Sequence, residues 1–121
     1  MRLERKKKML RLVNLKDGEH SVESAIATVE LEIEQAKKEG IVALKVLHGY
    51  GSHGKGGVIM LHLRKTLIMW KKQGFVVDYF GGDKWSLFDQ QSKEILNADK
   101  SIYGDCDIDH GNPGITIIKL I

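Results

Sequence analysis

Residues 41–57 read IVALKVLHGYGSHGKGG, in which a short apolar run passes directly into a glycine-rich segment. Residues 41–48 favour a β-strand and are few enough for a central one. Five of the nine residues from Gly49 to Gly57 are glycines, more than an ordinary turn requires. A helical pattern follows, so backbone amides at this strand–loop–helix junction can bind phosphate oxygens. We therefore expect a loop that exposes its backbone and contacts an anion.

Extended and helical patterns alternate on both sides of this segment. Before it, apolar residues recur at three- and four-residue steps from Val22 to Ala36, with Ser21 as N-cap and Gly40 as stop. The predicted elements are strands at residues 9–15, 41–48, 75–80 and 115–121, and helices at residues 22–40 and 58–73. This order predicts an α/β fold, a two-layer sandwich of two main helices on a sheet of about four strands, mostly parallel or mixed.

The chain has 121 residues, which fits one domain. We expect a basic N-terminal arm at residues 1–8 and a domain at residues 9–121, with an insertion at residues 81–114. No apolar run approaches the roughly 18 residues that a membrane span requires, and the basic start lacks the apolar core of a signal peptide. With Cys106 as the single cysteine, these features predict a cytoplasmic protein with no membrane partner.

Basic charge is segregated along the sequence. The formal charge is only +3, yet residues 1–11 carry +5, residues 12–40 carry −4, residues 41–80 carry +5 and residues 81–114 carry −4. Grouped lysines and arginines suit a polyanion binder, because each neutralised phosphate releases condensed counterion. The alternative is a solvated tail and a solvated helix face.

The predicted insertion is mostly polar and has weaker patterns. Leu87, Ile95 and Leu96 are compatible with a short helix, and a connection of this length in a small domain is usually functional or mobile. Trp85 and Phe88 suggest either a lid that stacks on a ligand or a satellite core. The sequence favours the core.

Alternating acidic residues near the end of the insertion invite a metal-site interpretation. Asp105, Asp107, Asp109 and His110 offer ligands on one turn, but the glycine and closing glutamate of a calcium-binding EF-hand are missing. We therefore expect a solvated acidic turn and predict no resident metal.

The glycine-rich segment also matches two nucleotide-binding motifs. Gly49, Gly51 and Gly54 form GxGxxG, and Asp78 follows where a ribose-binding acid would be sought. A dinucleotide domain, however, normally begins with this motif and needs more strands. The segment also matches the GxxxxGK of a P-loop, but Gly56 stands where a Mg²⁺-binding Ser or Thr is required. Neither motif is complete.

Several side chains around the loop suit contact with nucleic acid. His48 is the strongest histidine candidate because it ends a strand beside the loop, and His53 suits contact with phosphate. Tyr50 either stacks on a base or covers the sheet edge. These residues, with the basic helix that follows, favour a nucleic-acid partner.

The layout and the loop together resemble the Smr (small MutS-related) domain family. The residues that carry the resemblance are VNLK at 13–16, HGYG at 48–51, Leu63-Arg64, and GITII at 114–118. The resemblance implies a fold like the C-terminal domain of translation initiation factor three, binding to branched or single-stranded DNA or RNA, and often endonuclease activity. A divalent metal would accompany cleavage.

The first family motif departs from its usual form in this chain. The family reads Leu-Asp-x-His, and its Asp and His are implicated in cleavage, whereas Asn14 and Lys16 occupy these positions here. Asn cannot act as a carboxylate base, and Lys does not exchange protons near neutral pH. Asp17 and His20, just downstream, are therefore the substitute catalytic candidates alongside His48.

The sequence predicts nucleic-acid binding in preference to cleavage. The predicted contact residues are His48, Gly49, Tyr50, Gly51, His53, Lys55 and Arg64. The alternative from another class is a protein-interaction module whose working surface is the insertion at residues 81–114.

Overall fold

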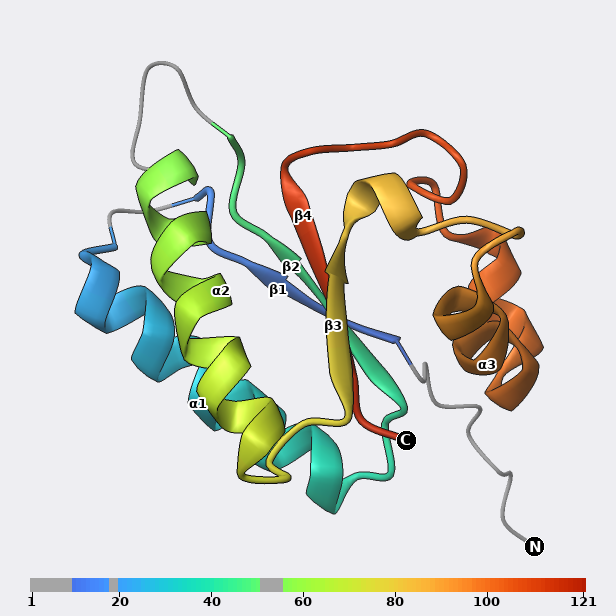
Figure 1. Ribbon diagram of the computed structural model, residues 1–121, viewed down its shortest axis with the longest axis horizontal. Coiled ribbons are helices and arrows are strands. Elements are labelled where there is room, and N and C mark those ends of the chain that lie inside the picture. Colours follow the sequence, from blue (N-terminus) through green and yellow to red (C-terminus); the bar gives the residue numbers. More distant parts are fainter. Residues whose placement is uncertain (1–9, 18–19, 51–55) are drawn as a thin grey trace, which may run out of the picture.

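The computed structural model describes residues 10–17, 20–50 and 56–121 (Figure 1). The described residues form four strands and three α-helices, with two short 3₁₀ turns. In chain order these are β1 (Leu10–Asn14), α1 (Val22–Lys38), β2 (Ala43–Leu47), α2 (Gly56–Lys72), β3 (Asp78–Gly81), a 3₁₀ turn (Gly82–Lys84), α3 (Gln90–Ala98), a 3₁₀ turn (Lys100–Gly104) and β4 (Ile115–Lys119). The predicted α/β class is confirmed.

The four strands form one mixed sheet in the order β1-β2-β4-β3. β1 and β2 are parallel, whereas β4 runs antiparallel to both of its neighbours, β2 and β3. The last strand of the chain therefore lies between two earlier ones. As a result, the carboxyl ends of β1, β2 and β3 meet the start of β4 at one edge of the sheet, which we call the carboxyl edge.

Helices α1 and α2 cover one face of the sheet, as the sequence predicts (Figure 1). Their buried residues recur at helical spacing and pack against Leu44, Val46 and Ile118 of the sheet. Burying each large aliphatic side chain contributes roughly 1.5–3 kcal/mol. The predicted ends of α1 are confirmed: the Ser21 hydroxyl accepts a hydrogen bond from the Ser24 amide at 3.0 Å, and Gly40 has a φ of 74°.

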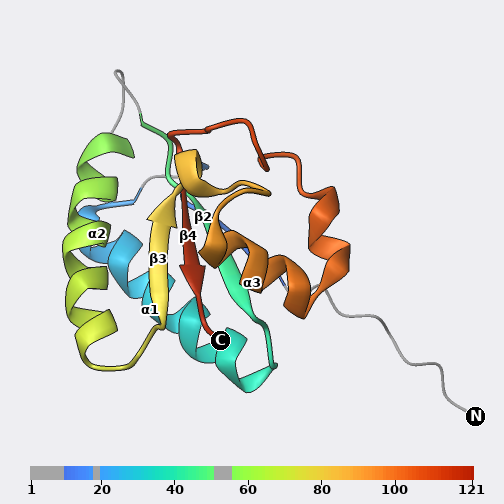
Figure 2. The same ribbon diagram turned by 45° about the vertical axis from the view of Figure 1, so that its right-hand side comes forward.

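Residues 81–114 pack on the opposite face of the sheet, with α3 on the other side of the strands from α1 and α2 (Figure 2). Trp85 is fully buried there, and its indole N–H donates to Asp105 at 2.9 Å. The predicted satellite core is therefore confirmed for Trp85. Phe88, by contrast, is 86% exposed and does not belong to it.

Two buried lysines on the strands attach this segment to the sheet. Lys45 of β2 binds Asp105 at 2.7 Å and Asp107 at 2.8 Å, and Lys119 of β4 binds Gln91 and Glu94. Burial alone would lower the pKa of Lys45, but its two carboxylate partners raise it above the ordinary value. The prediction of a solvated acidic turn is wrong for Asp105 and Asp107, because both face a buried cation.

The helices of residues 10–17, 20–50 and 56–121 include none with the length and apolar character needed to cross a membrane.

Candidate nucleic-acid interface

The register of β1 and β2 brings two predicted motifs together at the carboxyl edge. Asn14 is opposite Leu47, and the Leu15 amide donates to the Leu47 carbonyl at 2.8 Å. The side chain of Lys16 lies against Gly49, 3.5 Å from the position that a Cβ on this glycine would occupy. Residues that follow β1 and residues that follow β2 therefore form one surface.

A directed chain of hydrogen bonds fixes His48 behind this surface. Arg64 donates to the Thr116 hydroxyl through Nε at 3.2 Å and through Nη2 at 3.1 Å. The same hydroxyl is 2.9 Å from His48 Nε2, and His48 Nδ1 is 2.5 Å from the Gly49 carbonyl oxygen. Because that carbonyl can only accept, Nδ1 carries the proton and Nε2 accepts from Thr116. The chain runs from Arg64 through Thr116 and His48 to Gly49.

His48 is only 2% exposed, and its environment favours the neutral ring. Burial lowers the pKa of His48 below its ordinary value of 6.5, and the positive charge of Arg64 acts in the same direction. The Gly49 carbonyl opposes the shift. The sequence predicts His48 as both a catalytic and a contact residue, whereas in the structure both of its ring nitrogens are engaged within the protein.

The turn after β2 is held from two further sides. The amides of His48 and Gly49 both donate to the Gly114 carbonyl at 3.0 Å. At the start of α2, a Cβ on Gly56 would lie 2.6 Å from the His48 carbonyl oxygen, so this position has no room for a side chain. Gly49 itself has a φ of 74°, which glycine adopts without strain.

Arg64 connects α2 to the ends of β3 and β4. Its guanidinium is half-buried and lies beside Gly81, 2.9 Å from the position of a Cβ there. Gly81 therefore makes room for the arginine. A cation is thus fixed at the carboxyl edge by contacts with two strands.

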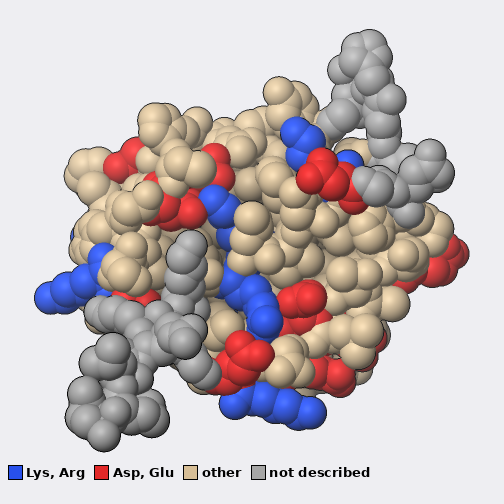
Figure 3. All heavy atoms as spheres, turned by 180° about the vertical axis from the view of Figure 1, so that it is seen from behind, with Lys and Arg blue, Asp and Glu red and all other residues tan. Residues whose placement is uncertain are grey.

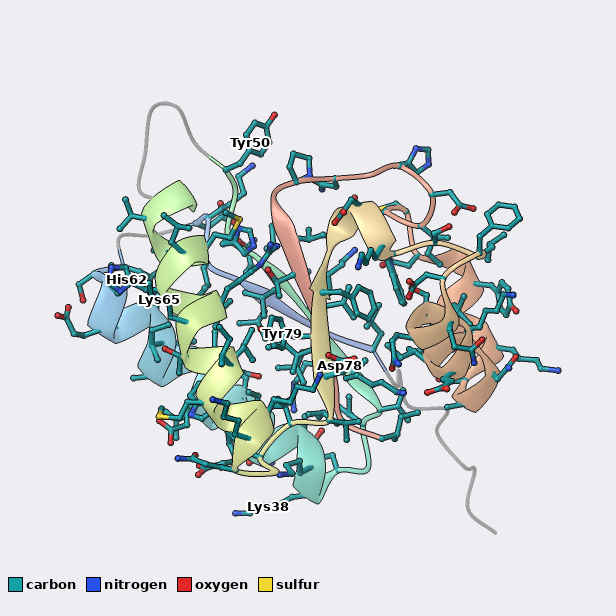
Figure 4. The ribbon with its side chains drawn as sticks, in the orientation of Figure 1. Lys38, Tyr50, His62, Lys65, Asp78 and Tyr79 are labelled. Carbon is teal, nitrogen blue, oxygen red and sulfur yellow. The ribbon has the colours of Figure 1, made fainter. Side chains whose placement is uncertain are left out.

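Tyr50 projects from the end of the sheet (Figure 4). One edge of its ring faces Gly114, 3.4 Å from a Cβ position on that glycine, yet the residue is 65% exposed. The ring therefore has a free surface for stacking, although it also covers part of the edge. Both predicted roles of Tyr50 are compatible with this position.

The loop after β1 is organised by Asn14. Its side-chain oxygen accepts from the amides of Lys16 and Asp17 at 2.9 and 3.3 Å, and its amide group donates to the Asp17 carboxylate at 3.1 Å. His20 lies 3.4 Å from the Ser24 hydroxyl at the start of α1. These contacts hold Asp17 and His20 within their own segments.

Four predicted elements of the site lie outside the described residues: Gly51, His53, Lys55 and the basic arm at residues 1–8.

The dinucleotide interpretation of the glycine-rich loop is wrong. Asp78 begins β3 and pairs with Lys119 at the end of β4, so it lies at the sheet edge opposite Gly49 (Figure 4). Its carboxylate binds Lys71 at 3.1 Å. An acid in this position cannot reach a ribose beside Gly49.

Three residues that build the site are not among the predicted contact residues: Thr116, Gly114 and Asn112. The Gly114 carbonyl accepts from two amides of the turn, and the Asn112 side-chain oxygen accepts from the Gly114 amide at 2.8 Å. Thr116 is fully buried and interrupts a run of isoleucines, which is a signal that sequence inspection can detect. The roles of Asn112 and Gly114 depend on chain pairing that only the fold reveals.

Among the described residues, the back of the molecule carries charges of both signs (Figure 3). Lys and Arg atoms there alternate with Asp and Glu atoms (Figure 3). Arg11 of β1 also forms an ion pair with Glu32 of α1, with 3.2 Å between Nε and Oε1. The carboxyl edge is therefore a better candidate for polyanion contact than this face.

Among the described residues, no three His, Cys, Asp or Glu side chains are grouped so that they could hold a metal ion. The sequence matches no protein-family model, and no similar sequence was found among curated proteins. The geometry of the carboxyl edge is therefore the basis for a functional proposal.

We expect His48 to make stability depend on pH. Above pH 6.5 the ring is neutral in both folded and unfolded chains; as pH falls below 6.5, the unfolded chain binds a proton that the folded chain resists. Stability should therefore fall, by up to about 1.4 kcal/mol per pH unit from this group. Urea unfolding at several pH values between 7 and 5 gives the free energy of unfolding as a function of pH. This dependence should be shallower for His48→Gln than for His62→Gln, which alters an exposed histidine. Equal slopes would contradict the assignment.

Proposed function

We propose that this chain binds nucleic acid at the carboxyl edge of β1 and β2. The observation that carries the proposal is the convergence of Lys16, Tyr50 and Arg64 around a fixed turn at residues 48–50. Cations contact phosphates, and an exposed aromatic ring stacks on a base. Together they suit a strand with unpaired bases, as in single-stranded or branched DNA or RNA.

The start of α2 adds to this surface. Its first turn contains no acidic residue, and backbone N–H groups at a helix N-terminus carry partial positive charge. This favours a phosphate beside Gly56 and Gly57. The +5 charge of residues 41–80 supports the same partner.

The arrangement supports binding in preference to cleavage. Asn14, which replaces the acid expected from the Smr resemblance, builds the loop after β1 instead of offering a carboxylate. His48 holds its proton toward Gly49 and accepts from Thr116, so it does not serve as a free base. Incubation with Mg²⁺ or Mn²⁺ should leave a bound oligonucleotide at its original length.

The Smr resemblance is part of this proposal. Its first two motifs lie side by side in the β1–β2 register, and Arg64 and Thr116, from the other two, are hydrogen-bonded to each other. We also propose that the fold is like that of the C-terminal domain of translation initiation factor three. A cytoplasmic setting, which suits the free and exposed Cys106, belongs to it as well.

A protein-interaction role for residues 81–114 is the second candidate function. It is favoured by Phe88, which is 86% exposed, beside Leu87, which is 39% exposed. A turn holds both outward: the Leu87 amide donates to Asp109 at 3.1 Å and the Phe88 amide to the Ser86 hydroxyl at 3.1 Å. Trp85 is buried and does not contribute to such a surface.

Fluorescence anisotropy with a labelled single-stranded or branched oligonucleotide tests the proposed function. We expect binding at low salt that weakens steeply as salt increases, because phosphate contacts release counterions. Tyr50→Ala should weaken binding by about 1–3 kcal/mol, roughly 5- to 150-fold, without changing the salt slope. Tyr103→Ala removes a similarly exposed tyrosine from residues 81–114 and should have no effect. Absence of binding at low salt would refute the proposal.

A further inference from the structure

A second chain of contacts links the buried Lys45 to the turn at residues 48–50. Asp107 binds Lys45 through Oδ2 at 2.8 Å and accepts from Asn112 Nδ2 through Oδ1 at 3.0 Å. The Asn112 side-chain oxygen then accepts from the Gly114 amide at 2.8 Å. The Gly114 carbonyl oxygen in turn accepts hydrogen bonds from the amides of His48 and Gly49. The chain therefore passes from the core of the sheet to its carboxyl edge through residues 107–114.

Each member of this chain has little freedom to move. Lys45 and Asp107 are largely buried, and their pairing lowers the pKa of Asp107, against the opposing effect of burial, so the carboxylate stays charged. The Asn112 backbone packs closely on Gly82: a Cβ on that glycine would lie 1.9 Å from the Asn112 carbonyl oxygen. The asparagine is thus held through both its backbone and its side chain.

We propose that Asn112 is a positioning residue of the nucleic-acid site, acting through Gly114 on the turn at residues 48–50. The inference rests on the proposed function for its effect on binding. Asn112 need not contact the ligand, because it orients the carbonyl that holds two amides of the turn. Residues 105–114 thus hold the site in place, and Asp105 and Asp107 contribute by binding Lys45 of the sheet.

The geometry allows a test by exchanging the two side chains. Asn112→Asp keeps a side-chain oxygen that can accept from the Gly114 amide. It replaces the amide group that donates to Asp107 with a second carboxylate, which repels Asp107. Asp107→Asn combined with Asn112→Asp restores one donor and one acceptor between the two positions, and leaves Asp105 to pair with Lys45. The double variant has the same composition and charge as the natural chain.

We expect Asn112→Asp to weaken oligonucleotide binding about fivefold or more, because the partly buried hydrogen bond from Asn112 to Asp107 is lost. Hydrogen exchange of the His48 and Gly49 amides should accelerate, because the Gly114 carbonyl is no longer fixed. The double variant should recover both properties. Asn97→Ala, an exposed asparagine of α3, is the control and should match the natural chain.

The outcomes separate this inference from the proposed function. The positioning role would be overturned if the natural chain binds the oligonucleotide and Asn112→Asp has the same affinity and the same amide exchange rates. The proposed function would then remain intact. Loss of affinity that the double variant does not recover would also overturn it. If the natural chain fails to bind, the proposed function fails, and amide exchange alone still decides whether Asn112 positions the turn.

Discussion

Replacing Lys45 by methionine should lower the free energy of unfolding by about 3–5 kcal/mol. The lysine side chain is 8% exposed and pairs with two largely buried carboxylates. Removing the cation leaves Asp105 and Asp107 facing each other without charge compensation, and burial makes that costly. The loss would also loosen Trp85, because its indole N–H donates to Asp105.

Urea unfolding at pH 7 measures this effect, with Lys38→Met as the matched control. Lys38 is exposed in the last turn of α1, where removing a positive charge costs about 0.3–1 kcal/mol at most. Adding Asp105→Asn and Asp107→Asn to Lys45→Met should recover part of the lost stability, because neutral amides are easier to bury than charges. Equal midpoints for the two single lysine variants would show that the buried pair does not secure residues 81–114.

The elements covering one face of the sheet were predictable, because they are local patterns. Apolar spacing with Ser21 and Gly40 at the ends defined α1, and residues 41–57 defined the strand and turn that lead into α2. The position of β4 between β2 and β3 was not predictable, because strand order depends on contacts between distant residues. The roles of Lys45 and Lys119 were not predictable for the same reason. Each is a charged residue in an apolar run, and its acidic partner comes from a distant segment that packs on the sheet.

The candidate site divides in a similar way. His48, Gly49, Tyr50 and Arg64 were predicted, because one segment and one helix supply them. The contacts that fix them were not, because Thr116, Gly114 and Asn112 reach the turn only through the pairing of β4 with β2. The structure also gives His48 an internal position, which its place beside a glycine-rich loop did not indicate.

Replacing Arg64 should produce a large loss of binding together with a change in its salt dependence. Its guanidinium supplies a fixed positive charge at the carboxyl edge and begins the hydrogen-bond chain through Thr116 to His48. Arg64→Met removes both contributions and keeps most of the apolar stem. We expect the dissociation constant for a labelled oligonucleotide to rise about tenfold or more, and the slope of log affinity against log salt to fall by roughly one, as for a lost phosphate contact.

Lys65 provides the control, because it is the next residue of α2, carries the same charge and is exposed on the helix flank near His62 (Figure 4). Circular dichroism should first establish that both variants are folded. Anisotropy titrations across a range of salt concentrations then test the central claim. The account predicts a large loss of affinity with a reduced salt slope for Arg64→Met and a change within about twofold for Lys65→Met. Natural affinity and an unchanged salt slope in Arg64→Met would contradict nucleic-acid binding at the carboxyl edge.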